Sequence, residues 1–140
     1  MKKLTKRSNC PLSSSLDIFG DKWSLLIIRD MMFYKKSTYG DFLKSDEKIA
    51  TNILATRLQG LEESKLIEKL KHPDSKAKVL YVLTQKAIDL LPIMLEMYFW
   101  ADKYLTIPAD IKAKIKEAKK DKDTFVKTMT KELKKQVDTV

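Results

Sequence analysis

The sequence predicts a mainly helical α+β domain that contains one small β-hairpin. Apolar residues between Ile49 and Leu70 recur every three or four positions, which is the spacing of one face of an α-helix. The run continues into KLKHPDSKAKVLYVLT, where His72 and Pro73 mark a turn and β-branched and aromatic residues alternate after Lys78. A helix that leads directly into a hairpin therefore occupies the middle of the chain.

Two helices are expected in the first part of the chain. Pro11 suits a first helical position, and Gly20 can end the helix that follows it. Asp21 is a suitable N-cap for the next helix, DKWSLLIIRDMMFYKK, which is apolar on most of its circumference. Such a helix belongs at the centre of the domain, and Trp23 is expected to pack in the core or at a dimer contact.

The helix after Ile49 is expected to be the second of a helix-turn-helix pair. A short helical pattern around Tyr39 and Phe42 precedes it, and a polar turn at residues 45–48 separates the two. Its apolar side carries Ile53, Leu54, Leu58 and Leu61. From this window alone, an ordinary amphipathic surface helix is an equally good interpretation. The order of helix, turn, helix and hairpin favours a winged helix-turn-helix.

The opposite side of this helix is small and polar, so that it can enter the major groove of DNA. Asn and Gln side chains can pair with adenine, and a Thr methyl group can contact thymine. Lysines before the helix and at the hairpin tip can meet phosphates. The predicted DNA-binding residues are Lys44, Lys48, Thr51, Asn52, Ala55, Thr56, Arg57, Gln59, Lys76 and Lys78. The acidic pair Glu62 and Glu63 opposes this interpretation, which leaves a winged helix used for protein contacts as an alternative.

Composition and charge set broad limits. The chain has 140 residues, 44% of them hydrophobic, which is enough for one domain with its own core. The formal charge of +9 favours anionic partners, but +4 lies in residues 1–7 and another +4 in residues 106–140. Residues 8–105 keep only +1, so a basic face there depends on where individual lysines are placed.

Several classes of function are excluded by the residue types present. Cys10 is the only cysteine and His72 the only histidine, so neither an intrachain disulfide nor the usual zinc ligand sets can form. There is no Gly-rich phosphate loop and no acidic cluster suited to metal-assisted chemistry, which predicts a protein that is not an enzyme and has no cofactor. The lack of a secretory signal or a long apolar run predicts a cytoplasmic protein without a membrane partner.

A long helix is expected from Thr84 onward, running for about 20 residues and kinked at Pro92. It carries two apolar lines, which is more than a small core needs. The surplus surface, together with the helix after Pro11, predicts a homodimer that forms through the terminal helices. The expected interface residues are Leu12, Leu16, Met94, Met97, Tyr98, Trp100 and Tyr104. The same methionines and aromatic residues could instead line a ligand pocket at that interface.

Residues 106–140 form a Lys-rich helical extension in which a thin apolar stripe begins after Pro108. One long helix or two helices hinged at residues 120–124 would both fit. We expect the extension to dock on the dimer, because a membrane-surface helix needs a bulkier apolar face. The expected organisation is a basic flexible arm over residues 1–8, a winged helix-turn-helix domain with dimerisation helices over residues 9–105, and this extension over residues 106–140.

Four segments, CPLSSSLDIFGDKWSLLIIRDM, YGDF, IATNILATRLQGLEESKLI and YVLTQKAIDLLPIMLEMYFWADKYL, together resemble the HxlR-type family of winged-helix transcription regulators. The resemblance implies a small homodimer that binds double-stranded DNA and regulates transcription. Two positions depart from the family pattern. Lys65 replaces a Gly after the recognition helix, which requires a strained left-handed residue there, and Ala87 replaces another Gly, which favours the helix.

Cys10 is the candidate switch residue. It precedes Pro11 and follows Lys6 and Arg7, whose charges could stabilise a thiolate. On chemistry alone, inert packing is the commoner role of a free cysteine, but the resemblance implies sensing of oxidants or electrophiles through the cysteine before proline. Oxidation could then yield an intersubunit disulfide, a mixed disulfide or an electrophile adduct. The predicted function is a homodimeric, sequence-specific DNA-binding regulator that responds to an oxidant or another small-molecule effector.

Overall fold

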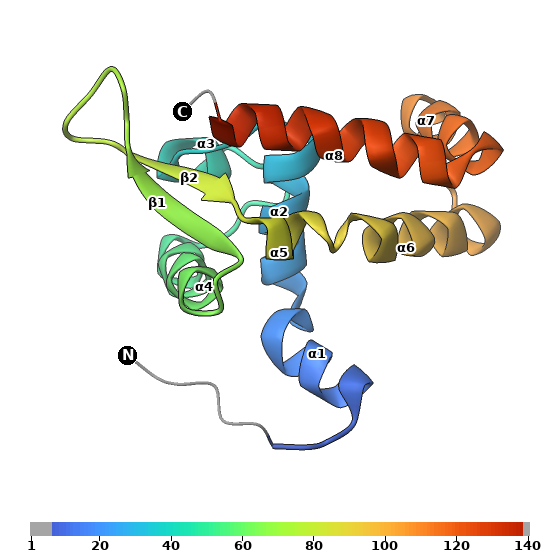
Figure 1. Ribbon diagram of the computed structural model, residues 1–140, viewed down its shortest axis with the longest axis horizontal. Coiled ribbons are helices and arrows are strands. Elements are labelled where there is room, and N and C mark those ends of the chain that lie inside the picture. The colour runs from blue at the N-terminus through green and yellow to red at the C-terminus, as the bar shows by residue number, and fades with distance from the viewer. Residues whose placement is uncertain (1–6, 139–140) are drawn as a thin grey trace. The chain divides into compact units, whose positions relative to one another are not determined.

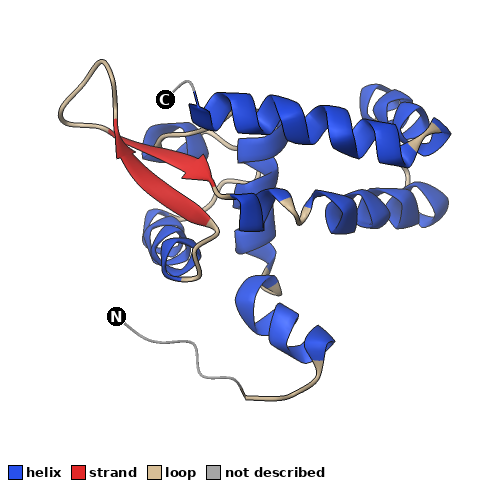
Figure 2. Ribbon diagram, in the orientation of Figure 1, coloured by secondary structure: helices blue, strands red, loops and turns tan. Residues whose placement is uncertain are grey.

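The structure, a computed structural model, describes residues 7–138 (Figure 1). The first six residues of the predicted basic arm lie outside this described part. The chain divides into two compact units, of which the first ends at Ala87 and the second begins at Ile88. Helices dominate, and the described residues form a two-stranded antiparallel sheet (Figure 2), so the predicted mainly helical α+β class is confirmed. None of the described helices is long and apolar enough to cross a bilayer.

The first unit has the order of elements expected of a winged helix. In chain order these are α1 (Pro11–Phe19), α2 (Lys22–Phe33), α3 (Tyr39–Leu43), α4 (Thr51–Glu63), β1 (Ile67–Lys71) and β2 (Val79–Leu83), with α5 (Gln85–Ile88) at the boundary. In the antiparallel pair, Ile67 lies opposite Leu83 and Lys71 lies opposite Val79. The loop at residues 72–78 projects beyond the strands as the wing (Figure 1).

The second helix, α2, lies at the core of this unit, as its apolar circumference predicts. Ile27, Ile28, Met31 and Met32 are all buried, and the helix contacts α1, α4 and β2. The predicted N-cap is also confirmed, because the Asp21 carboxylate accepts hydrogen bonds from the backbone N–H and the hydroxyl of the residue three positions later. Burial of this helix is what fixes the position of α4 against it.

The end of α4 is a Schellman motif made without glycine. The N–H of Leu66 donates to the carbonyl of Leu61 at 2.9 Å, and the N–H of Lys65 donates to the carbonyl of Glu62 at 3.0 Å. Lys65 has a φ of 61°, a left-handed conformation that costs an L-residue about 1–2 kcal/mol. The strain expected of a non-glycine residue is therefore present. A further contact supports this helix end, since Lys86 Nζ donates to the carbonyl of Ser64 at 2.8 Å.

The second unit contains α6 (Leu91–Tyr104), α7 (Ala109–Lys120) and α8 (Lys122–Asp138). The prediction of one kinked helix from Thr84 is wrong, because the chain leaves the helix after Ile88 and α6 begins with Pro92 in its first turn. Proline has no N–H to continue the hydrogen-bond ladder, and only in a first turn is that N–H not needed. The helix is therefore interrupted just before the proline and not bent at it.

The two-helix interpretation of the C-terminal extension is confirmed. Asp121 has an extended backbone, with φ −154° and ψ 86°, and it separates α7 from α8. Its carboxylate accepts hydrogen bonds from Thr124 N at 3.1 Å and Thr124 Oγ1 at 2.7 Å, so it caps the start of α8. These hydrogen bonds lower the pKa of Asp121 below its ordinary value.

Candidate nucleic-acid interface

The recognition-helix candidate, α4, presents its polar side to solvent. Leu54, Leu58 and Leu61 are at most 2% exposed, and their burial turns the opposite side of the helix outward. The exposed residues of that side, called the polar face below, are Thr51, Asn52, Ala55, Thr56 and Gln59. Their side chains are small or slender, which suits the major groove of B-DNA, about 12 Å wide.

The start of α4 is held by neighbouring residues. Ala50 occupies the N-cap position and offers no side-chain hydrogen bond. The Tyr39 hydroxyl on α3 donates to the carbonyl of Thr51 at 3.0 Å. Ile49, which precedes the N-cap residue, has a buried side chain. The N–H groups of the first turn are thus left without a capping side chain, an arrangement that suits a DNA phosphate as their acceptor.

Two members of the polar face use a hydrogen-bonding group within the helix. Thr56 Oγ1 donates to the carbonyl of Asn52 at 2.9 Å, and Gln59 Nε2 donates to Glu63 Oε1 at 3.3 Å. The Thr56 methyl group remains available for a thymine contact, whereas the Gln59 amide must leave Glu63 before it can pair with a base. Within the described part of the chain the Asn52 side chain forms no hydrogen bond, so it needs no such rearrangement.

Arg57, which was predicted to contact a phosphate, is engaged within the protein. Its Nε lies 2.9 Å from Oδ2 of Asp21, the residue that caps α2. The N–H direction does not satisfy hydrogen-bond geometry, so the contact is an ion pair. Burial raises the pKa of Asp21, but the hydrogen bonds from Ser24 and the charge of Arg57 outweigh burial and leave the pKa below its ordinary value. The pair ties the middle of α4 to the start of α2.

Lys44 and Lys78 are distant in the sequence but line the same groove. This groove has a volume of about 320 Å³ and lies between α3 and the base of the wing. Tyr39 and Tyr81 contribute to its walls. Sequence periodicity does not indicate that the two tyrosines meet, because the groove is formed by a helix and a strand from different parts of the chain. The remaining lysines of the predicted set, Lys48 and Lys76, are exposed.

The acidic residue in the same groove, Asp41, already has its hydrogen-bonding partners. It closes a capping box with Thr38, and its Oδ2 accepts from the backbone N–H groups of Ser37 and Thr38, each at 3.2 Å. Burial raises the pKa of Asp41, but these hydrogen bonds and the charge of Lys44 lower it overall. The carboxylate is therefore fixed at the start of α3, and the two lysines supply the positive charge of the groove.

The acidic pair that opposes DNA binding lies in the last turn of α4. Glu62 Oε1 is 3.7 Å from Lys69 Nζ on β1, and Glu63 accepts the hydrogen bond from Gln59. Both glutamates are half-buried. Their charges are thus partly balanced by neighbours, and they lie at the opposite end of the helix from Thr51 and Asn52.

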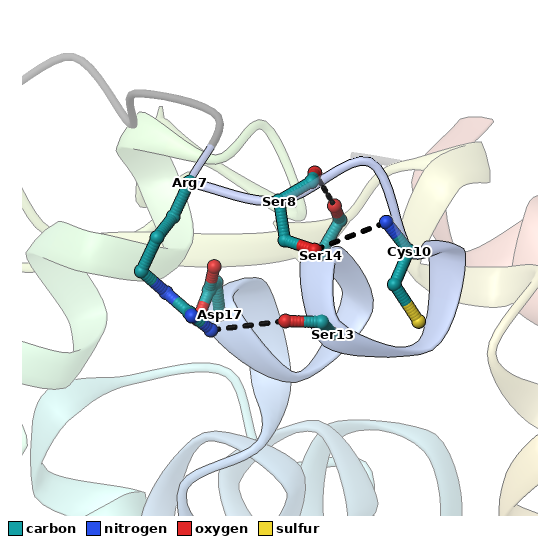
Figure 3. A network of polar contacts seen from close by, with 6 residues as sticks. All are labelled: Arg7, Ser8, Cys10, Ser13, Ser14 and Asp17. Carbon is teal, nitrogen blue, oxygen red and sulfur yellow. Dashed lines mark hydrogen bonds and ion pairs between the residues drawn. The ribbon is translucent and has the colours of Figure 1, made fainter.

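Cys10 occupies the N-cap position of α1 and is exposed. Its backbone N–H donates to Ser8 Oγ at 3.1 Å, and Ser14 Oγ donates to the carbonyl of Ser8 at 3.0 Å (Figure 3). These hydrogen bonds hold the backbone at the start of α1. The thiol itself is open to solvent.

Arg7 is not the neighbour of the thiol that the sequence suggested. Its Nη2 donates to Ser13 Oγ at 2.9 Å and pairs with Asp17 Oδ1 at 3.3 Å. The sulfur of Cys10 points away from this pair (Figure 3). The other cation invoked for the thiolate, Lys6, lies outside the described residues, so any activation of Cys10 must come from a group other than Arg7.

Most of the predicted interface residues are exposed in the single chain. Those with more than half of their surface exposed are Leu12 and Leu16 on α1 and Met97, Trp100 and Tyr104 on α6. Tyr98 is half-buried. The prediction is wrong for Met94, which is only 5% exposed and belongs to the core of its own chain. On α6, the rings of Trp100 and Tyr104 are 5.1 Å apart between centroids and form one aromatic patch.

Comparison with known proteins identifies the family. Residues 18–108 match the family described as HxlR-like helix-turn-helix. The chain is 32% identical over 96 residues to the HTH-type transcriptional regulator YodB of Bacillus subtilis, which covers 68% of this chain and 85% of YodB. The reduced form of YodB superposes with a TM-score of 0.58 at 30% identity, over 69% of this chain and 95% of YodB.

Two further solved structures are similar. Quinone-bound YodB from B. subtilis has a TM-score of 0.56 at 29% identity and covers 68% of this chain and 99% of that one. The redox regulator HypR in its oxidised form has a TM-score of 0.61 at 26% identity and covers 70% of this chain and 100% of HypR. The matched region spans α2 to α6, including the helix-turn-helix and the wing. The chain therefore belongs to the HxlR-like helix-turn-helix family of transcriptional regulators.

Proposed function

We propose that this regulator is a homodimer that binds a specific sequence in double-stranded DNA, with α4 of each subunit in a major groove. The exposed polar face of α4 carries the proposal, because its side chains are free of the core while the leucines opposite them are buried. Asn52 pairs bidentately with adenine, Gln59 does so once it leaves Glu63, and the methyl of Thr56 contacts thymine.

Phosphate contacts position the helix in this arrangement. Lys44 and Lys78 border one groove, and a DNA strand that follows it meets both charges. Lys48, in the turn before α4, and Lys76, in the wing, extend the same set of exposed cations. Such contacts supply affinity and orientation without reading sequence. Arg57 contributes by fixing α4 against α2 through Asp21.

Dimerisation follows from the exposed apolar side chains of α1 and of α6. Leu12 and Leu16 on one helix, and Met97, Trp100 and Tyr104 on the other, are costly to leave in water, and a second copy of the chain can cover them. Two-fold symmetry then requires a pseudo-palindromic operator whose half-sites are one helical turn, or a multiple of it, apart.

Selection from randomised duplex tests the proposal. The protein is incubated with a pool of random sequence, and the bound fraction is amplified and sequenced over several rounds. We expect an enriched motif with dyad symmetry. An enriched motif without a dyad, or no enrichment at all, would contradict symmetric recognition.

A winged helix used only for protein contacts is the alternative that this experiment must separate. A DNA-binding module loses affinity steeply between about 50 and 200 mM salt, because each phosphate contact releases counterions. A protein-docking module needs no affinity for duplex at any salt concentration. Titration of duplex binding at both ends of this range therefore distinguishes the two.

A redox or electrophile response through Cys10 is the second part of the proposal. The exposed thiol and the similarity to quinone-bound YodB and oxidised HypR support it. With a quinone, the Cys10 thiolate adds to a ring carbon and one ring oxygen takes up a proton. The hydrogen of the attacked carbon then moves as a proton to the other ring oxygen, which gives a thioether-linked hydroquinone. We expect operator affinity to change on quinone treatment in the parent and not in Cys10→Ser. An equal response in both proteins would exclude Cys10 as the sensor.

A non-covalent effector remains the alternative form of regulation. A pocket for it would be lined at the dimer interface by Met97, Trp100 and Tyr104. A response to quinone that persists in Cys10→Ser would favour this alternative.

A further inference from the structure

The ten lysines of residues 106–140 divide into three groups in the structure. Three of them are ion-paired to α6: Lys112 and Lys119 lie 2.8 and 3.0 Å from the carboxylate of Asp102, and Lys122 lies 2.6 Å from Glu96. Hydrogen bonds from Lys112 and Lys119 lower the pKa of Asp102. These three lysines are therefore paired with carboxylates of their own unit.

A second group forms a continuous stripe along α8. At 100° per residue, Lys127, Lys131, Lys134 and Lys135 fall within about 100° of arc on the same side of the helix, and all four are exposed. Among the described side chains, none of the four is in an ion pair. The opposite side of the helix carries the half-buried Phe125, Val126 and Met129 and the buried Leu133. These four lysines are called the α8 stripe below.

The third group, on α7, lacks this organisation. Lys114, Lys116 and Lys120 are exposed, but Asp110 and Glu117 lie between them on the same side of the helix. The stripe on α8 is interrupted by no acidic residue between Lys127 and Lys131, and Glu132 lies on its flank. The two helices therefore carry similar numbers of exposed lysines in different arrangements. Acids lie among the lysines of α7, whereas on the stripe side of α8 they lie only at its two ends, at Asp123 and Asp138.

Stabilisation of the helix does not account for the whole stripe. Cations near a helix C-terminus interact favourably with its dipole, but the effect falls off within the last turn. Lys127 and Lys131 lie well before the last turn of α8, which ends at Asp138. The charge of Lys131 is therefore available to a partner, while Lys127 also helps to lower the pKa of Asp121, after the hydrogen bonds from Thr124.

We propose that the α8 stripe is a sequence-independent contact for the phosphate backbone of duplex DNA. This proposal rests on the DNA-binding function proposed above. The stripe extends over about 12 Å at 1.5 Å per residue, a length over which duplex DNA presents about seven phosphate charges. It lies outside the region matched by the family, residues 18–108, so it adds to the winged helix-turn-helix a contact that this chain supplies itself.

Two triple variants of the full chain test the contact. K127Q/K131Q/K134Q removes three charges of the stripe, and K114Q/K116Q/K120Q removes three exposed charges of α7, so both lower the formal charge from +9 to +6. Gln and Lys have similar helix propensities, and far-UV circular dichroism verifies that both variants keep the parent fold. Affinity for the selected operator and for a scrambled duplex of equal length is measured by fluorescence anisotropy between 50 and 200 mM salt.

We expect the α8 variant to bind both duplexes more weakly by the same factor, so that its preference for the operator is unchanged. Its salt dependence should be shallower by about 2.7 in the slope of log K against log salt for each engaged chain, which amounts to about 40-fold over this salt range. The α7 variant should keep the parent slope.

Three results would overturn the contact. Equal changes in slope for the two variants would mean that net charge alone matters. An unchanged slope in the α8 variant would mean that the stripe does not reach DNA, while the winged helix of the parent still binds its operator. A parent that binds neither duplex would overturn the proposed DNA-binding function, and the stripe contact with it.

Discussion

Asp21 stabilises the fold in two ways that substitutions can separate. Its carboxylate caps the first turn of α2 through Ser24, and it pairs with Arg57 of α4. Asp21→Ala removes both interactions, whereas Asp21→Asn keeps a side chain that can cap a helix and removes the charge. Loss of an N-cap costs about 1 kcal/mol, and a partly exposed ion pair contributes about 0.2–1 kcal/mol. We therefore expect Asp21→Ala to lower the free energy of unfolding by about 1–2 kcal/mol and Asp21→Asn by less than about 1 kcal/mol.

Urea unfolding followed by circular dichroism at neutral pH measures both values. A double-mutant cycle of Asp21→Asn with Arg57→Gln isolates the ion pair, because removing both partners should cost less than the two single losses added together. Equal destabilisation by Asp21→Ala and Asp21→Asn would refute the capping role. Strict additivity in the cycle would refute the contribution of the Arg57 pair.

The lowered pKa of Asp21 also fixes the direction of its pH dependence. The stability that this carboxylate contributes is fully present above its unfolded pKa of about 3.9 and is lost as the pH falls through the lower folded pKa. Asp21→Asn should therefore lose less stability than the parent on acidification below pH 4. A parallel loss in the two proteins would contradict this assignment.

Four other substitutions follow from the structure. Asn52→Ala should weaken operator binding by about 1–3 kcal/mol and relax the preference at one base pair of each half-site; a loss that is uniform over all duplexes in an anisotropy series would contradict base reading. Lys78→Gln should weaken binding to every duplex alike and reduce the salt slope by about 0.9 for each engaged chain, so a base-dependent loss would exclude a phosphate contact. Trp100→Ala should shift the sedimentation coefficient from dimer to monomer at equal helix content, and an unchanged coefficient would place the interface elsewhere. Lys65→Gly should raise the free energy of unfolding by up to about 1 kcal/mol, because relief of left-handed strain exceeds the added flexibility of the unfolded chain; a lower urea midpoint would contradict this.

Local chemistry made much of the first unit predictable. The three- and four-residue spacing of Leu54, Leu58 and Leu61 determines which side of α4 is buried, and the polar face follows from it. The N-cap at Asp21 was predictable because it depends only on the Asp21 carboxylate and on the backbone of the next three residues. The left-handed backbone of Lys65 was predictable in the same way. A helix that ends there and leads into a strand needs a left-handed residue, whichever side chain that residue carries.

Features that depend on contacts between distant segments were not predictable in the same way. Arg57 lies on the border of the polar face, and only the position of α2 shows that Asp21 is its partner. The groove between Lys44 and Lys78 forms because a helix and a strand that are distant in the sequence lie side by side, and no local sequence pattern indicates this contact. Apolar periodicity continues across Pro92 and so predicts an uninterrupted helix there, yet the missing N–H is accommodated most easily where a helix begins.

Methylation interference on the selected operator tests most directly whether α4 reads bases from the major groove. Dimethyl sulfate modifies guanine N7, which lies in the major groove, and adenine N3, which lies in the minor groove. We predict that N7 methylation of guanines within the half-sites blocks binding at two dyad-related clusters one helical turn, or a multiple of it, apart. Methylation of adenine N3 between the clusters should have little effect. Interference confined to adenine N3, or present on one half-site only, would contradict recognition by a symmetric pair of α4 helices.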